Sequence, residues 1–377
     1  MMKKFLFFIT LFLLLENRLV YSVEIDSKYG LLYDYTTNEI VFAKNIDTPH
    51  PPSSLTKLMT AYIVFDKIKK NEITLDTKFF VSIRAWRQEG SRMFLEPEWK
   101  VNIDELLKGL IVVSGNDAAV ALAEGVSGNV EDFVKLMNET AKKIGMVNTN
   151  FVNPTGLHDK NHYSTVKDLL VLSIAIIDSF PDFYEKYFSI TEYRFNNLLQ
   201  KNRNTMLLRY PGTDGLKTGN TGMGGFALIA SAKKNRQRFI SIVNGAKDDD
   251  TRFFDSIGLM DYGFDQYQYI ELAKKNEPIV DINTIMGDNK SEHFLYAKED
   301  VIIYPVKKDK VKNLKVNVIY DINNYTKAKK GDKVGVLRFI ENDRIEEYDL
   351  YTSGDIEGMS TFSQFFTYFK RNCRTFF

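Results

Sequence analysis

Three short strings of polar residues carry the side chains from which a catalytic site could be built. They are Ser54-Leu-Thr-Lys57, Ser114-Gly-Asn116 and Lys217-Thr-Gly219. Each string is common by chance and says little alone. Together they supply a nucleophile beside a lysine, a second hydroxyl beside an amide, and a cation beside a hydroxyl. These groups suit attack on a carbonyl that lies next to a carboxylate.

The first string predicts an activated serine. Ser54 and Lys57 are three residues apart at an expected helix start, so their side chains share one face. A serine hydroxyl attacks well only when a base takes its proton. A lysine becomes that base when burial or another cation lowers its pKa, and Lys217 is the candidate cation. The alternative is a helix cap at Ser54 and a surface lysine at Lys57.

The other two strings could handle the proton and the substrate. Ser114 could relay a proton between Lys57 and a leaving amine, and Asn116 could hold Lys57 and accept a substrate amide. Capping of the flanking helices by Gly115 and by Asn116 or Asp117 is the alternative.

The third string offers groups that bind a carboxylate. Lys217 and Thr218 supply a charge and a hydroxyl, while Gly219 lets another backbone approach closely. A turn before a strand is the alternative.

The histidines do not predict a metal site. His158 and His162 are four apart, a spacing that binds zinc on a helix, but Pro154 and Gly156 favour a loop. No third ligand suggests itself, so we expect neither a metal nor a cofactor. The chain also lacks the Gly-x-Ser-x-Gly turn of many serine hydrolases.

The elements that must position these strings alternate between strands and helices from about residue 24 to residue 264. Pro51 and Pro52 stop any earlier helix, and Ser53 or Ser54 could cap a helix that runs to Lys69. The remaining expected helices cover 103–113, 118–124, 130–144 and 165–177, and the expected strands cover 29–35, 39–43, 226–232 and 238–244.

From about residue 277 to residue 355 short apolar stretches alternate with lysines, and Gly331-Asp332 marks a turn. The pattern predicts a small antiparallel β domain. Its lysines are better explained as a solvated face than as a binding patch. The expected strands are 301–306, 311–320, 333–339 and 346–351.

Both ends of the chain differ from the body. Lys3 and Lys4 precede an apolar run from Phe5 to Leu15, which is typical of a signal peptide ending near Ser22. An uncleaved anchor is the alternative, and either one predicts export. The last residues repeat phenylalanines at helical spacing with cations off that stripe, which predicts an amphipathic helix on a membrane surface. A helix packed on the body is the alternative.

Composition sets broad limits. The 377 residues suffice for two domains, and 44% hydrophobic with 26% charged residues is ordinary for a globular protein. A net charge of +1 gives no electrostatic reason to expect nucleic acid. Cys373 is the only cysteine, so no internal disulfide forms. We expect a signal peptide (1–22), a catalytic domain (23–268), a β-rich domain (269–357) and an anchoring helix (358–377).

The residues around the three strings resemble those of the low-molecular-mass penicillin-binding proteins that act as serine D-alanyl-D-alanine carboxypeptidases. The likeness runs from about residue 24 to the end. The segments that carry it are Pro52-Ser-Ser54-Leu-Thr-Lys57-Leu-Met-Thr60, Ser114-Gly-Asn-Asp-Ala-Ala-Val-Ala-Leu-Ala-Glu124, Asn153-Pro-Thr-Gly-Leu157, His162-Tyr-Ser-Thr165 and Asp214-Gly-Leu-Lys-Thr-Gly219.

The resemblance implies an α/β catalytic domain of the β-lactamase/DD-peptidase type, with helices on both sides of an antiparallel sheet and a helical subdomain. A small all-β domain and a terminal amphipathic helix would follow. It further implies a substrate, the peptidoglycan stem pentapeptide, and inhibition by β-lactam antibiotics. The enzyme would work at the periplasmic face of the cytoplasmic membrane.

The resemblance also implies a role for each site residue. Ser54 would attack the carbonyl between the two terminal D-alanines, Lys57 would be the base, Ser114 the proton relay and Asn116 a substrate-positioning residue. The terminal carboxylate would lie on Lys217, Thr218 and Gly219, and the backbone N–H groups of Ser54 and Asn220 would bind the oxyanion.

The chain departs from the family pattern at two positions. Asn220 stands where many relatives have histidine, and Ser53 stands where alanine is commoner, although only Ser54 has a lysine three residues later. Arg252 is a further candidate for carboxylate binding, with a salt bridge to the 248–250 aspartates as the alternative. Two other functions share some of these features: a β-lactamase and a non-catalytic cell-wall scaffolding protein.

Overall fold

The computed structural model describes residues 23–281, 292–307, 315–320, 328–341 and 344–356. The expected signal peptide and the expected anchoring helix lie outside these residues, as do positions 311–314 of one expected strand. Within the described part of the chain, no helix has the length and hydropathy needed to cross a bilayer.

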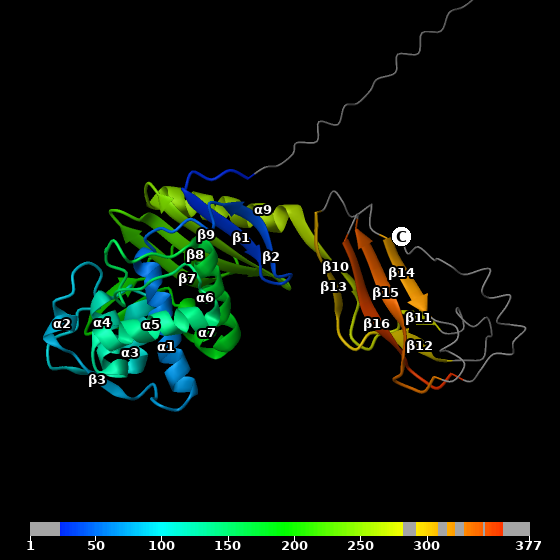
Figure 1. The fold of residues 1–377 in the computed structure, drawn as a ribbon, viewed down its shortest axis with the longest axis horizontal. Helices are drawn as coiled ribbons and strands as arrows, with labels where there is room; N and C mark the ends of the chain where they lie inside the picture. Colours follow the sequence, from blue (N-terminus) through cyan, green and yellow to red (C-terminus); the bar gives the residue numbers. More distant parts are fainter. Residues whose placement is uncertain (1–22, 282–291, 308–314, 321–327, 342–343, 357–377) are drawn as a thin grey trace, which may run out of the picture.

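A five-stranded antiparallel sheet forms the centre of the catalytic part (Figure 1). Six consecutive residues in the middle of β8 and six in the middle of β9 are buried, which is the pattern of a sheet covered on both faces. The strands, in spatial order, are β2 (Glu39–Lys44), β1 (Tyr29–Asp34), β9 (Gln237–Ala246), β8 (Gly225–Lys234) and β7 (Thr213–Thr221).

Helix α9 (Asp249–Gln266) covers one face of this sheet (Figure 1). Asp248 caps its start by accepting a hydrogen bond from the Thr251 N–H at 2.7 Å. Phe253, Leu259 and Met260 pack from the helix against the even-numbered side chains of β8.

The opposite face carries the helical subdomain, whose core includes Ile240 and Ile242 of β9. Four of its helices begin with a side-chain cap, at Ser82, Asn102, Asn129 and Thr165. Its helices are α1 (Lys57–Lys69), α2 (Ile83–Trp86), α3 (Ile103–Ile111), α4 (Asn116–Ser127), α5 (Val130–Ile144), α6 (Val166–Ser179) and α7 (Pro181–Phe188). Short elements complete this part: the antiparallel pair of β3 (Lys78–Phe80) with β4 (Lys100–Asn102), the hairpin of β5 (Glu192–Phe195) with β6 (Leu198–Lys201), and helix α8 (Met206–Arg209).

The start of the first long helix differs from the sequence-based expectation. Residues Ser53–Thr56 form a 3₁₀ turn, η1, and α1 begins only at Lys57. Neither serine caps this helix, so that prediction was wrong: Thr56 occupies the N-cap position of α1 and Pro52 that of η1, and neither start has a side-chain cap hydrogen bond. The physical reason is that the Ser53 hydroxyl lies 2.8 Å from that of Thr221 on β7.

The C-terminal part is all-β, as expected. Strand β10 (Tyr267–Ala273) pairs with β13 (Val301–Lys307). A second sheet has the order β11 (Val280–Asp281), β12 (Phe294–Tyr296), β16 (Arg344–Thr352), β15 (Lys333–Glu341) and β14 (Lys315–Tyr320). Leu295, Leu337, Phe339 and Leu350 are almost fully buried at its centre.

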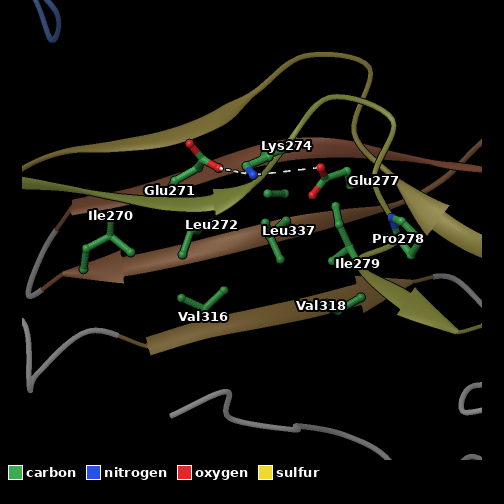
Figure 2. A pocket seen from close by; sticks show the side chains of 11 residues that line it. Ile270, Glu271, Leu272, Lys274, Glu277, Pro278, Ile279, Val316, Val318 and Leu337 are labelled. Atoms are coloured by element: carbon green, nitrogen blue, oxygen red, sulfur yellow. Dashed lines mark ion pairs between the residues drawn. The ribbon is translucent and has the colours of Figure 1, made fainter. Parts of the chain in front are cut away.

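A hollow of about 430 Å³ lies in this β domain and not beside the three strings. Figure 2 shows aliphatic side chains such as Leu272, Ile279 and Val316 lining it. At its edge the Lys274 ammonium lies 3.9 Å from the Glu271 carboxylate and 4.0 Å from that of Glu277.

Candidate active site

The turn η1 and the first residue of α1 bring Ser54 and Lys57 together. The Lys57 Nζ donates to the Ser54 Oγ at 2.9 Å and to the Thr155 carbonyl at 2.6 Å. The Lys57 side chain is 1% exposed, whereas Ser54 is only half-buried. The predicted nucleophile is therefore accessible to solvent, and its predicted base is buried and in hydrogen-bond contact with it.

The environment of Lys57 suits a base. Burial lowers its pKa to about 7, although the negative charge of Asp117 opposes the shift and the positive charge of Arg203 adds to it. A substantial fraction of the amine is then uncharged at neutral pH. An uncharged Lys57 can accept the proton of the Ser54 hydroxyl.

The loop that holds Lys57 is shaped by Asn153. Its Oδ1 accepts hydrogen bonds from the Thr155 N–H at 3.1 Å, the Thr155 hydroxyl at 2.9 Å and the Gly156 N–H at 2.7 Å. Gly156 has a φ of +83°, and a Cβ there would lie 1.8 Å from the Ser53 carbonyl oxygen. Only glycine lets this loop approach the nucleophile turn so closely.

Replacing Gly156→Ala should therefore displace the Thr155 carbonyl from Lys57. We expect a loss of about 2 kcal/mol in the free energy of unfolding and acylation by penicillin that is slower by roughly tenfold or more. Urea unfolding and stopped-flow acylation measure the two effects. Gly145→Ala is the matched control, because Gly145 has a φ of +94° with no atom within 4 Å of its added Cβ. Equal acylation rates in the two variants would contradict this account.

Ser114 and Asn116 lie where α3 ends and α4 begins. Both are buried, at 3% and 4% exposed. The Ser114 Oγ and the Asn116 Oδ1 find no hydrogen-bond partner among the described residues. Buried polar atoms normally have partners, so these two are free to serve a bound substrate.

Asn116 is held by a neighbouring loop and not by Lys57. Its Nδ2 donates to the Glu89 carbonyl at 2.5 Å, and its backbone N–H donates to the Ser91 carbonyl at 2.7 Å. The structure shows no hydrogen bond between Asn116 and Lys57, which sequence reasoning had proposed. The amide orientation leaves its oxygen available.

The third string forms the sheet edge that faces the nucleophile turn. Lys217 and Thr218 are 2% and 5% exposed. Burial lowers the pKa of Lys217 well below its usual value, and the charges of Lys57, Arg252 and Arg203 lower it further. A Cβ on Gly219 would lie 3.2 Å from the Ser53 Cβ, so Gly219 permits the close packing of β7 on η1.

Arg252 forms the salt bridge that the sequence offered as an alternative, with Asp249 as the partner. Its guanidinium also donates to the Gly219 carbonyl at 3.1 Å and the Ala227 carbonyl at 3.3 Å. Arg252 thus braces the strand that carries Lys217. Asn220, the next residue on β7, is exposed.

Sequence reasoning missed Arg203. This exposed residue follows β6. Burial is the main cause of the lowered pKa of Lys57, Lys217 and Arg252, and the charge of Arg203 lowers all three further. The next residue, Asn204, donates from its Nδ2 to the Gly215 carbonyl on β7 at 3.0 Å. This tertiary contact ties the segment of Arg203 to the strand of Lys217, and no sequence pattern indicates it.

His162 has a structural place near the site. Its Nδ1 accepts from the Val152 N–H at 3.2 Å, and its Nε2 lies 2.8 Å from the Thr56 hydroxyl. Burial lowers its pKa to about 4, so the imidazole is neutral at pH 7. Over the described ranges no group of three or more His, Cys, Asp and Glu side chains could hold a metal ion.

Comparison with known proteins decides the family. Residues 16–248 match the peptidase family S11, D-alanyl-D-alanine carboxypeptidase, and residues 267–358 match the C-terminal domain of penicillin-binding protein 5. The chain belongs to the D-alanyl-D-alanine carboxypeptidase family. As a carboxypeptidase of this family it is a serine-type hydrolase.

Two curated relatives show how far the similarity of this carboxypeptidase extends. The D-alanyl-D-alanine carboxypeptidase DacC of Escherichia coli is 35% identical over 347 residues, 90% of this chain and 86% of the relative. DacF of Bacillus subtilis is 34% identical over 317 residues, 83% and 81% of the two chains. The sequence-based interpretation as a carboxypeptidase, and not the alternatives, is confirmed.

Solved structures agree with the fold of this carboxypeptidase. Penicillin-binding protein 5 of Haemophilus influenzae has a TM-score of 0.71 at 31% identity, covering 90% of this chain and 99% of that one. Penicillin-binding protein D2 of Listeria monocytogenes, solved in an ampicillin-bound form, has a TM-score of 0.60 at 31% identity and covers 65% and 99%. The predicted α/β domain with its all-β companion is therefore confirmed.

Proposed function

We propose that Ser54 is the nucleophile that removes the terminal D-alanine from a peptidoglycan stem pentapeptide. The observation that carries this proposal is the 2.9 Å contact between the Ser54 Oγ and the buried Lys57 Nζ. The lowered pKa of Lys57, about 7, supports its role as the base. No other part of the described chain joins a half-exposed serine to a buried lysine in this way.

The reaction follows from these positions. Lys57 takes the proton of the Ser54 hydroxyl as the oxygen attacks the carbonyl between the two D-alanines. The Ser114 hydroxyl relays a proton to the leaving amine, the peptide C–N bond breaks, and D-alanine departs. Water then attacks the ester on Ser54, its proton returns through the same groups, and the shortened peptide leaves. The free Oγ of Ser114 supports its place in this relay.

The substrate's terminal carboxylate would bind between β7 and the cations beside it. Besides burial, the positive charges of Lys57, Arg252 and Arg203 lower the pKa of Lys217, and that of Arg203 also lowers the pKa of Arg252. An incoming carboxylate would offset these positive charges. The Thr218 hydroxyl would add a hydrogen bond, and Arg252 would act mainly by bracing the Gly219 carbonyl.

The oxyanion would form between two backbone N–H groups, those of Ser54 and Asn220. The tight packing of Gly219 on the nucleophile turn, where a Cβ would lie 3.3 Å from the Leu55 Cγ, supports their closeness. Backbone donors do not depend on the side chain, so asparagine can replace the commoner histidine at position 220.

The test is release of D-alanine from a synthetic pentapeptide, measured beside hydrolysis of penicillin. We expect D-alanine release in many turnovers and one slow turnover of penicillin per enzyme. One relative, penicillin-binding protein D2 of Listeria monocytogenes, was solved in ampicillin-bound and cefotaxime-bound forms, which supports β-lactam binding by this chain. Rapid, repeated penicillin hydrolysis without D-alanine release would instead identify a β-lactamase.

We propose that the enzyme is exported and works at the periplasmic face of the cytoplasmic membrane, held by residues 358–377. The helical spacing of Phe362, Phe365, Phe366 and Phe369 supports this anchor. The proposed domain limits are those expected from the sequence: 23–268 for catalysis and 269–357 for the β domain.

Deleting residues 359–377 should release the mature protein from membranes and leave its peptidase activity intact. The reason is that the tail supplies the aromatic and basic side chains for the bilayer surface, whereas the candidate site lies between residues 54 and 252. Flotation of membranes followed by the D-alanine assay measures both. Unchanged membrane association after removal of the signal peptide would disprove this anchor.

A further inference from the structure

Asp117 is a buried carboxylate for which the mechanism above has no use. It follows Asn116 in the first turn of α4 and is 1% exposed. Its hydrogen-bond partners among the described residues are all backbone N–H groups. They belong to Met93 at 3.0 Å, Leu95 at 3.1 Å and Ala118 at 2.9 Å. Burial of a carboxylate is costly unless hydrogen-bond donors such as these replace the lost water.

Two of these bonds fix a loop in a strained conformation. Met93 and Leu95 flank Phe94, which has a φ of +66°. Positive φ is unfavourable for a bulky residue and persists only where the surroundings impose it. Here the Asp117 carboxylate accepts hydrogen bonds from the N–H groups of the residues on both sides of Phe94, and these bonds hold Phe94 at positive φ.

The same loop holds Asn116. Its Glu89 carbonyl accepts from the Asn116 Nδ2 at 2.5 Å, and its Ser91 carbonyl accepts from the Asn116 N–H at 2.7 Å. Asp117 therefore fastens residues 93–95, and residues 89–91 fasten Asn116. The loop is thus bonded at both ends to two adjacent residues of α4. The Asn116 Oδ1 takes no part in these hydrogen bonds.

Asp117 also acts on the base by charge. The charged or titratable groups that face Lys57 are Lys217 on β7, Arg203 after β6, the neutral His162 and Asp117. Among these groups Asp117 alone is a carboxylate. Burial lowers the pKa of Lys57, and Asp117 limits that shift.

We propose that Asp117 is a positioning residue with two effects: it holds Asn116 in place through the 89–95 loop, and it supplies the negative charge that balances Lys57. The inference rests on the proposed role of Lys57 as base. A purely structural carboxylate would affect folding alone, whereas loss of this one should also move the pH at which the enzyme becomes active.

The test is Asp117→Asn, with acylation by a fluorescent penicillin followed from pH 5 to pH 9. Loss of the charge lowers the pKa of Lys57, so the uncharged amine forms at lower pH. We expect the acidic limb of the rate profile to move down by roughly one pH unit. Loss of the hydrogen bonds to the loop should lower the plateau of the acylation rate by roughly ten- to a hundred-fold.

Asp168→Asn is the matched control. Asp168 is also buried in the first turn of a helix, 2% exposed, and it accepts from the Asn148 N–H at 2.7 Å and the Thr149 hydroxyl at 2.6 Å. It is not among the groups that shift Lys57. Asp168→Asn should lower stability and leave the acidic limb in place.

A second variant separates strain from charge. Phe94→Gly accepts a φ of +66° without cost, so Asp117→Asn with Phe94→Gly should fold even if the single variant does not. If the acidic limb stays at the wild-type pH in either Asp117 variant, the claim that Asp117 balances the charge of Lys57 is wrong. If the plateau of the acylation rate is unchanged, the claim that Asp117 positions Asn116 is wrong. Lys57→Ala separates a failure of the Asp117 proposal from a failure of the proposed function. Normal acylation in Lys57→Ala would mean that Lys57 is not the base, whereas slow acylation there would leave only the role of Asp117 in error.

Discussion

Ser54→Ala should reduce D-alanine release by roughly four orders of magnitude or more and abolish labelling by a fluorescent penicillin. In the proposed mechanism the Ser54 oxygen forms the covalent bond with the substrate, and alanine has no such oxygen. Steady-state release from a pentapeptide and in-gel fluorescence measure the two losses. The fold should survive, because among the described residues the half-buried Ser54 side chain accepts a hydrogen bond only from Lys57.

Ser53→Ala is the control for this result. The Ser53 side chain is 1% exposed, and its hydroxyl lies 2.8 Å from that of Thr221, so it is turned toward β7 and away from solvent. We expect this variant to keep its labelling and at least a tenth of its activity. Loss of labelling in Ser53→Ala, with labelling retained in Ser54→Ala, would show that the neighbouring serine reacts.

Lys57→Met should slow acylation by roughly a hundred- to ten-thousand-fold and remove its pH dependence below neutrality. In the wild type the pKa of Lys57, about 7, places the acidic limb near neutral pH. Below that pH the amine is protonated and cannot act as a base, so the rate falls as pH falls. Methionine fills the buried volume without a charge, so the variant should fold.

Lys67→Met supplies the comparison within the same helix. Lys67 lies on the surface of α1, where its ammonium pairs with Glu72 at 2.5 Å. Its replacement should leave both the rate and the acidic limb unchanged. A Lys57→Met profile that keeps the wild-type limb would show that another group is the base.

Much of the site could be predicted because its groups are local in sequence. Ser54 and Lys57 are one helical turn apart, so helix geometry alone places them on one face. The helix from Val130 to Ile144 was predicted with its observed limits, because Asn129 caps it and Gly145 ends it in the left-handed region. Lys217 was predicted to be a cation close to Lys57. In the folded chain the charge of Lys57 contributes to the lowered pKa of Lys217, as that proximity requires.

The rest depends on contacts that sequence patterns do not encode. The partner that holds Lys57 is a backbone carbonyl, that of Thr155, and every residue carries such an atom. Arg203 reaches the site only because the chain turns between β6 and α8. The expected cap at Ser53 failed because its hydroxyl bonds Thr221, which is distant in sequence and adjacent in space. Tertiary contacts outweighed the local preference in each case.

The most direct measurement is the position of the covalent adduct. The protein would be trapped with penicillin, digested, and sequenced by tandem mass spectrometry. Our account predicts one penicilloyl group per chain, attached to Ser54, in the wild type and none in Ser54→Ala. An adduct on Ser53, on Ser114 or on any other residue would contradict it.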